Sequence, residues 1–149
     1  MNNLLKPELS HCEERQKIIV SRDRGGCEHR ALNSSECLVR QFYLDEEIIP
    51  KDQESCDRLV LNIDNRRAYF IELKGTDIQK AIDQIEASEK YLQQELNQYK
   101  KLYRIIYRTG SHRINSRKTI QWKESKGCLP GTSIPIAIIK SRKLEESIV

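Results

Sequence analysis

The chain has little that would suit a membrane, secreted or fibrous protein. Its longest apolar run is a handful of residues, far below the roughly 20 that a helix needs to span a bilayer. Its opening segment, MNNLLKPELSHCEERQ, carries charge too early for the apolar core of a secretory signal. Glycine and proline, with six and four residues, are too sparse for a long linker, and no internal repeat is present. We therefore expect a cytoplasmic protein that does not contact a membrane.

Paired cysteine motifs are also missing. The five cysteines are odd in number and include no CxxC pair, which argues against a disulfide framework and against a zinc ribbon. His11-Cys12 and Cys27-x-His29 are the nearest approach to metal-ligand spacing. We interpret the cysteines as reduced, mostly buried side chains.

What the chain does have is the composition of one compact domain. Its 149 residues are enough to bury a real core, and 38% hydrophobic with 32% charged residues is ordinary for a globular protein. The net charge of +4 is modest. Composition alone therefore points to no particular activity.

Local patterns predict an α/β fold with a mixed sheet flanked by helices. Pro7 favours a first helix over residues 7–19, followed by a loop over 21–35 around Gly25-Gly26. Alternating apolar residues predict three strands, with a hairpin turn at 64–67 between the second and the third. The three segments are residues 38–49, 57–63 and 68–74.

The second half of the chain continues this pattern. Thr76 and Gln79 have the form of a capping box, and apolar residues then recur at helical spacing to about residue 100. Residues 102–107 and 133–139 are typical of strands, whereas 116–124 fits either a helix or a strand.

The chemistry-bearing residues gather in the segment CDRLVLNIDNRRAYFIELKG. Period two places Glu72 and Lys74 on one face of their strand. If this strand pairs with the preceding one through the turn, Asp57 lies opposite the Glu72–Lys74 end. An ExK pattern alone is common on half-exposed strands. Here, however, it follows a buried apolar run, an acid begins the strand before it, and Gly75 with a capped helix comes next.

Such a group suits hydrolysis of a phosphodiester bond. Two carboxylates, with the Leu73 carbonyl as a third protein ligand, would hold Mg²⁺, and Mn²⁺ could substitute for it. The metal would polarise the phosphate and lower the pKa of a bound water. Lys74 would add fixed positive charge and orient or help deprotonate that water.

These residues resemble the signature of the PD-(D/E)XK nuclease superfamily, which has the restriction-endonuclease-like fold. That signature is an acid at a strand start, a short spacer, then (D/E)xK on the next strand, and Asp57, Glu72 and Lys74 match it. The element order is similar to the family's αβββαβ core. Members often carry a glutamine on the helix that follows, and Gln84 matches it. Cys56 stands where the family carries a proline.

The resemblance implies a metal-dependent nuclease that usually acts on DNA. Some members add a glutamate from the first helix, and the sequence leaves four candidates open: Glu13, Glu14, Glu28 and Glu36. It also leaves open a different class, a non-cleaving nucleic-acid-binding or protein-interaction module on the same fold. DNA is favoured over RNA, and both a homodimer and a component of a larger defence or DNA-processing complex are compatible with the chain.

A basic segment supplies candidate contacts to the nucleic-acid backbone. Between residues 100 and 126 nine cations are opposed only by Glu124, which favours a polyanionic partner unless this is simply a solvated face. Arg22, Arg24 and Arg30, around the glycine pair, would add contacts. The predicted binding residues are Lys100, Lys101, Arg104, Arg108, Arg113, Arg117 and Lys118.

Overall fold

A computed structural model describes residues 3–73, 77–108 and 116–149. Its central element is a five-stranded sheet in the order β3 (Val39–Tyr43), β4 (Arg58–Asn62), β5 (Arg67–Leu73), β6 (Lys100–Tyr107) and β7 (Ala137–Ser141). The first three of these strands are antiparallel, and β5, β6 and β7 are parallel. The fold is therefore mixed α/β, as the sequence predicts.

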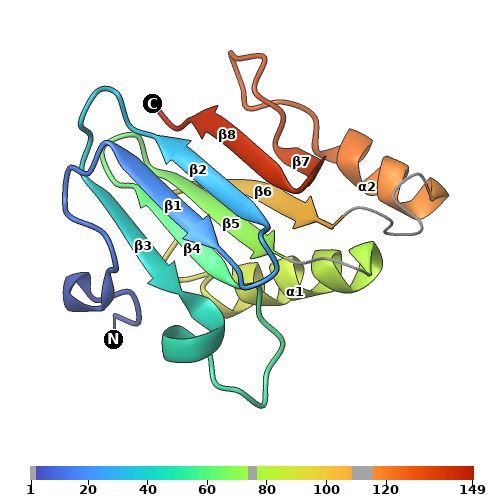
Figure 1. Ribbon diagram of the computed structural model, residues 1–149, viewed down its shortest axis with the longest axis horizontal. Coiled ribbons are helices and arrows are strands. Elements are labelled where there is room, and N and C mark those ends of the chain that lie inside the picture. Colours follow the sequence, from blue (N-terminus) through green and yellow to red (C-terminus); the bar gives the residue numbers. More distant parts are fainter. Residues whose placement is uncertain (1–2, 74–76, 109–115) are drawn as a thin grey trace.

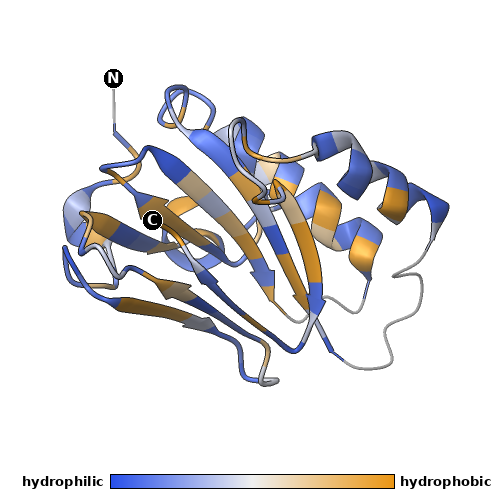
Figure 2. Ribbon diagram, turned by 90° about the horizontal axis from the view of Figure 1, so that it is seen from above, coloured by the Kyte–Doolittle hydropathy of each residue, from blue (hydrophilic) through white to orange (hydrophobic). Residues whose placement is uncertain are grey.

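A smaller sheet lies against one face of the central sheet, and the helices lie on the other (Figures 1 and 2). The smaller sheet joins the two ends of the chain, in the order β1 (Ile18–Arg22), β2 (Glu28–Leu32) and β8 (Lys143–Ser147). The helices are α1 (Ile78–Tyr91) and α2 (Arg117–Lys126). Neither of these described helices has the length and apolar character needed to cross a bilayer.

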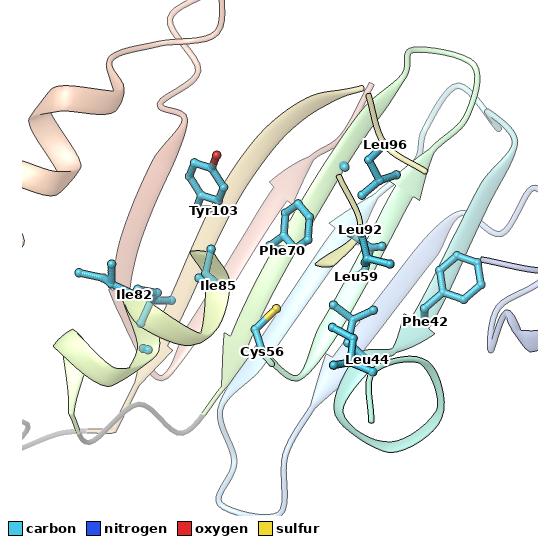
Figure 3. Packing of buried hydrophobic residues seen from close by; sticks show 14 of the residues in the cluster. Phe42, Leu44, Cys56, Leu59, Phe70, Ile82, Ile85, Leu92, Leu96 and Tyr103 are labelled. Atoms are coloured by element: carbon cyan, nitrogen blue, oxygen red, sulfur yellow. The ribbon is translucent and has the colours of Figure 1, made fainter. Parts of the chain in front are cut away.

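Alternation along β5 divides its side chains between two cores. Phe70 belongs to the core under α1, where Figure 3 shows it among side chains that include Ile85 and Leu59. Tyr69 and Ile71 belong to the core between the two sheets. Burying a side chain of this size stabilises the fold by roughly 1.5–3 kcal/mol. Because both faces of β5 are buried, the carboxylate of Glu72 near its end needs specific partners.

Helix α1 begins at the end of β5, where Asp77 caps it by accepting a hydrogen bond from the Lys80 N–H at 3.1 Å. The helix buries one stripe on the sheet and ends at Tyr91 rather than near residue 100. The predicted cap residue, Thr76, lies outside the described residues. The chain then returns to β6, which runs parallel to β5.

A buried ion cluster links the two sheets. Arg104 of β6 is fully buried and donates to Glu146 of β8 through Nε at 2.7 Å and Nη2 at 3.0 Å. His29 of β2, equally buried, bonds the same carboxyl at 2.7 Å. Burial raises the pKa of Glu146, but the hydrogen bonds from His29 and Arg104 outweigh it and leave that pKa below its usual value. As an anion, the Glu146 carboxyl therefore links β8 to β2 within the smaller sheet and to β6 of the central sheet.

The prediction for the N-terminal region is wrong. Only Pro7–Leu9 is helical, as a single 3₁₀ turn, and the expected loop over 21–35 is mostly the β1–β2 hairpin. The β-branched run of Ile18, Ile19 and Val20 explains this difference, because such side chains pack better on a strand than on a helix.

Three other boundaries also differ. The strand expected over 38–49 ends at Tyr43 and continues as one π-helical turn, η2 (Leu44–Ile48). The ambiguous segment 116–124 is helix α2, capped by Ser116. The last predicted strand begins at Ala137 rather than at 133, and β8 follows it.

Candidate metal and nucleic-acid site

The β4–β5 hairpin brings Asp57 and Glu72 together, as the sequence predicts. Arg58 pairs with Ile71, so the preceding residue, Asp57, faces Glu72. The Asp57 N–H donates to Glu72 Oε1 at 3.1 Å, and the Leu73 N–H donates to Asp57 Oδ2 at 2.8 Å. Each carboxylate is therefore held by the other strand's backbone.

Neighbouring elements hold the start of β4 in place. The Cys56 N–H donates to Ser88 Oγ of α1 at 2.8 Å, and Ser88 Oγ donates to the Gln84 carbonyl at 2.9 Å. Burial raises the pKa of the Cys56 thiol well above its usual value, so this side chain is an inert core residue. Ser88 thus fixes the position of Asp57 relative to the helix.

A first cleft, which we call the helix-side cleft, opens on the α1 side of these carboxylates. It has a volume of about 500 Å³. Asp57 and Glu72 line it, and so does Gln84 of α1, the glutamine that the family resemblance suggests. The remaining lining residues are Asp45, Lys51, Asp52, Gln53, Glu54, Ser55 and Lys80.

A second cleft of about 460 Å³, the hairpin-side cleft, opens toward the smaller sheet. Asp57 and Asp45 line it too, so the two clefts meet at this pair of acids. The β1–β2 turn forms its other wall, and the end of β6 contributes Arg108. The remaining lining residues are Arg22, Asp23, Arg24, Gly25, Glu46, Arg58 and Leu73.

Asp45 and Arg58 are site residues that the sequence did not predict. Asp45 lies on η2, where the strand β3 turns away from the sheet. Burial, the charge of Asp57 and a hydrogen bond to Asp57 raise the pKa of Asp45 to about 6, although Arg58 opposes the shift. The acidic run Asp45-Glu46-Glu47 directly after a strand was the only available signal.

Arg58 is the cation next to this acid pair. Its Nη1 lies 3.4 Å from Asp45 Oδ1 and donates to the Asp57 carbonyl at 3.0 Å. Its guanidinium carbon lies 3.7 Å from the centre of the Tyr43 ring, and His11 stacks on that ring at 3.6 Å. The stack fixes Arg58 beside the carboxylates, where it partly offsets their negative charge.

The predicted nucleic-acid residues do not form one surface. Lys100 and Lys101 begin β6, opposite Arg67 and Ala68, so they lie at the other end of the sheet from Glu72. Arg117 and Lys118 begin α2 and border a depression with Gln79 of α1. Arg113, like Lys74, lies outside the described residues.

The prediction for Arg104 is wrong. Its side chain is fully buried between the sheets and paired with Glu146, so it has no surface to offer a nucleic acid. In an alternating strand, Arg104 shares its face with Leu102 and Ile106, both of which are buried. The alternation of apolar residues along β6 could therefore have indicated that Arg104 is buried.

None of the four candidate glutamates joins the site. The first helix that was to carry one of them is absent from the described residues. Glu28 is on β2 and pairs with Arg22 at 2.7 Å, and Glu36 is in a turn with φ 51°. Glu13, Glu14, Glu28 and Glu36 are all absent from the linings of both clefts.

The donor set at Asp57 and Glu72 suits a hard cation. Carboxylate and carbonyl oxygens are what Mg²⁺ prefers, and it commonly takes only one or two protein carboxylates and keeps several waters. Burial is the main cause of the raised pKa of Asp45, and the neighbouring charges of Asp57 and Glu46 add to it. Across the described ranges, however, no group of three or more His, Cys, Asp or Glu side chains is arranged to hold a metal. The fit is therefore to a cation with two carboxylate ligands, not to a closed cage.

Comparison with known proteins adds no relative. No protein-family model, curated protein or solved structure matches the chain. Any function of the chain therefore has to be inferred from the geometry of the site.

Proposed function

We propose that the chain is a Mg²⁺-dependent nuclease that hydrolyses phosphodiester bonds, with DNA favoured over RNA as the substrate. One observation carries the proposal. Asp57 and Glu72, from paired strands, are held by each other's backbone and both line the helix-side cleft, and Asp57 also lines the hairpin-side cleft. Two carboxylates so close together repel each other, and a bound cation would remove that repulsion.

In this proposal the cation is held by Asp57, Glu72 and the Leu73 carbonyl, and Mn²⁺ can replace Mg²⁺. The metal supplies polarisation of the phosphate and a bound water of lowered pKa. Gln84, on the helix-side cleft, holds water through its side-chain amide. Lys74, which follows Leu73 directly, remains the predicted source of fixed positive charge for the phosphate.

The order of elements supports a restriction-endonuclease-like core. The meander β3-β4-β5, the helix α1 and the parallel strand β6 follow each other as βββαβ. The expected first helix is replaced by a 3₁₀ turn and the β1–β2 hairpin. We therefore propose the PD-(D/E)XK type of site on a core with an altered N-terminal region.

A non-cleaving module that binds nucleic acid or protein is the second candidate, and one observation favours it. The carboxylates of Asp57 and Glu72 already accept backbone hydrogen bonds, so they have a structural role that needs no metal. Cleavage separates the two candidates directly, because the module would bind its partner and leave phosphodiester bonds intact.

The decisive test is incubation of the protein with plasmid, linear and single-stranded DNA, and with RNA, over a range of Mg²⁺ and Mn²⁺ concentrations. We expect cleavage that EDTA abolishes and that Lys74→Ala and Asp57→Asn remove. Asp83→Asn is the matched control, because Asp83 is an exposed acid of α1 outside both cleft linings. Cleavage that survives EDTA or Asp57→Asn would refute the proposal.

Metal binding is tested separately by thermal melting. A ligand of the folded state raises its stability, so Mg²⁺ should raise the Tm of the wild type and of Asp83→Asn but not that of Asp57→Asn. An equal rise in all three proteins would remove Asp57 from the metal site.

Cutting both strands of a duplex needs two sites. A homodimer around the DNA, or assembly into a larger defence or DNA-processing complex, would supply the second one. Sedimentation of the protein with and without duplex DNA distinguishes the two arrangements, because a homodimer forms from the chain alone.

A further inference from the structure

The two clefts that meet at Asp57 differ in charge. Among their described lining residues, the helix-side cleft has five carboxylates and two lysines. The hairpin-side cleft has four arginines that match its four carboxylates. A polyanion that reaches Asp57 is therefore repelled on the α1 side and meets guanidinium groups on the side of the smaller sheet.

The arginines of the hairpin-side cleft come from segments far apart in the sequence. Arg22 ends β1, Arg24 lies in the β1–β2 turn, and Arg108 follows the last residue of β6. Figure 1 shows the turn between β1 and β2 beside the end of β5, and the shared cleft confirms this proximity. The N-terminal hairpin thus adds a basic wall to a site built by the central sheet.

Local contacts set the wall's shape. Gly26 has φ 90°, a conformation that glycine adopts without strain. Asp23 Oδ1 accepts the Cys27 N–H at 2.8 Å, which closes the turn. The guanidinium of Arg108 lies directly against Gly25, where a Cβ would come within 1.6 Å of Nη2. Arg108 therefore lies over the turn because residue 25 has no side chain.

Two of the arginines are available to a ligand. Arg24 is exposed and makes no hydrogen bond or ion pair with any residue that the structure describes. Arg108 is half exposed, and its ion-pair partner Asp23 lies 3.9 Å away. Arg22 instead donates to Glu28 at 2.7 Å, so it supports the wall rather than facing a ligand. Guanidinium groups bind phosphate oxygens through two parallel hydrogen bonds.

We propose that Arg24 and Arg108 bind the phosphate backbone of DNA next to the cleaved bond, so that the strand enters over the β1–β2 hairpin. This inference rests on the proposed nuclease function, since the DNA is the substrate of the same site. It assigns a substrate-binding role to the smaller sheet. Of the predicted binding residues on or next to β6, it keeps Arg108 at the end of the strand and leaves out Lys100 and Lys101 at its start.

The test is duplex binding in EDTA, so that cleavage does not interfere. The anisotropy of a fluorescein-labelled DNA duplex is measured over a series of KCl concentrations for the wild type and for Arg24→Ala/Arg108→Ala. The matched control is Lys100→Ala/Lys101→Ala, which removes the same charge about 23 Å away along β6, at 3.3 Å per residue. All proteins are checked for equal Tm, and single Arg24→Ala serves if the double variant does not fold.

We expect the Arg24/Arg108 variant to bind about tenfold more weakly at low salt. Each lost phosphate contact should also make the slope of log K against log salt shallower by about 0.9, or about 1.8 for two. The lysine control should keep the wild-type slope. Equal slopes for the two double variants, or a wild type that binds no duplex, would overturn the proposal.

Cleavage of plasmid with Mg²⁺ then separates this proposal from the nuclease function. Suppose that the wild type cuts DNA and that the Arg24/Arg108 variant binds and cuts DNA equally well. The proposed role of the two arginines is then refuted, and the nuclease function is supported. If Arg24 and Arg108 determine DNA binding but neither Mg²⁺ nor Mn²⁺ supports cleavage, the nuclease function is refuted and the DNA-binding role of the two arginines is supported.

Discussion

Asp45→Asn removes one of the two carboxyl groups that meet where the clefts join, and it keeps the shape of the side chain. The asparagine amide can still donate a hydrogen bond to Asp57, as the protonated acid does, and its carbonyl can still accept from Arg58. The substitution therefore resembles a permanently protonated Asp45. Its effect on stability measures the cost of ionising Asp45 in the folded protein, to which burial contributes most and the charge of Asp57 next.

The magnitude follows from the raised pKa. A carboxyl with a pKa of about 6 rather than 3.8 keeps its proton in the folded state at a pH where the unfolded chain has lost it. The resulting stability is fully present below pH 3.8 and is lost as pH rises through 6. The full difference would be about 3 kcal/mol. Because a third of the Asp45 side chain is in solvent, screening reduces our expectation to about 1 kcal/mol.

The assay is thermal melting in EDTA from pH 4 to pH 8. We expect Asp45→Asn to melt with the wild type near pH 4 and about 3 °C above it at pH 8. Mg²⁺ at pH 8 should narrow the gap, since a bound cation would relieve the repulsion between Asp45 and Asp57 in the wild type. A variant that is less stable than the wild type at pH 8, or a gap that does not change with pH, would refute the reasoning.

Three further predictions concern the framework around the site. Glu146→Gln leaves the Arg104 guanidinium buried without its anion and should cost about 3–5 kcal/mol in urea unfolding, whereas the exposed Glu145→Gln should cost almost nothing. Ser88→Ala leaves the buried Cys56 N–H without its acceptor and should lower the free energy of unfolding by about 1–3 kcal/mol in the same measurement. An unchanged free energy of unfolding would mean that the N–H finds another acceptor. With a thiol reagent and mass spectrometry, the exposed Cys128 should be labelled in the native protein, but Cys56 only after unfolding, since burial raises its pKa.

The part of the fold that local pattern determines was predictable. The turn between β4 and β5 and the alternation of their apolar residues fixed the register, and that register places Asp57 opposite Glu72. A register that differed by one residue would have exchanged the side chains of β5 between the core under α1 and the core between the two sheets. Gln84, which only the family resemblance suggested, lines the same cleft as Asp57 and Glu72.

What the sequence analysis missed depends on tertiary contacts. Asp45 joins the site only because η2 turns the chain back after β3, and no local periodicity indicates a π-helical turn. Arg104 was assigned to the surface by charge, whereas its anion comes from a strand 42 residues later. The N-terminal hairpin was missed because its strands are short and its partner β8 lies at the other end of the sequence.

That pairing has a consequence for the order in which the molecule assembles. Strands β3 to β6 and helix α1 are continuous in sequence, so their contacts can form early, whereas β2 must wait for β8, more than a hundred residues away. A chain still emerging from the ribosome could already place Asp57 opposite Glu72. Its β1–β2 hairpin, which carries Arg24, would not yet be held in place by β8. We expect the proposed binding of DNA by Arg24 and Arg108 to appear only after β8 has paired with β2.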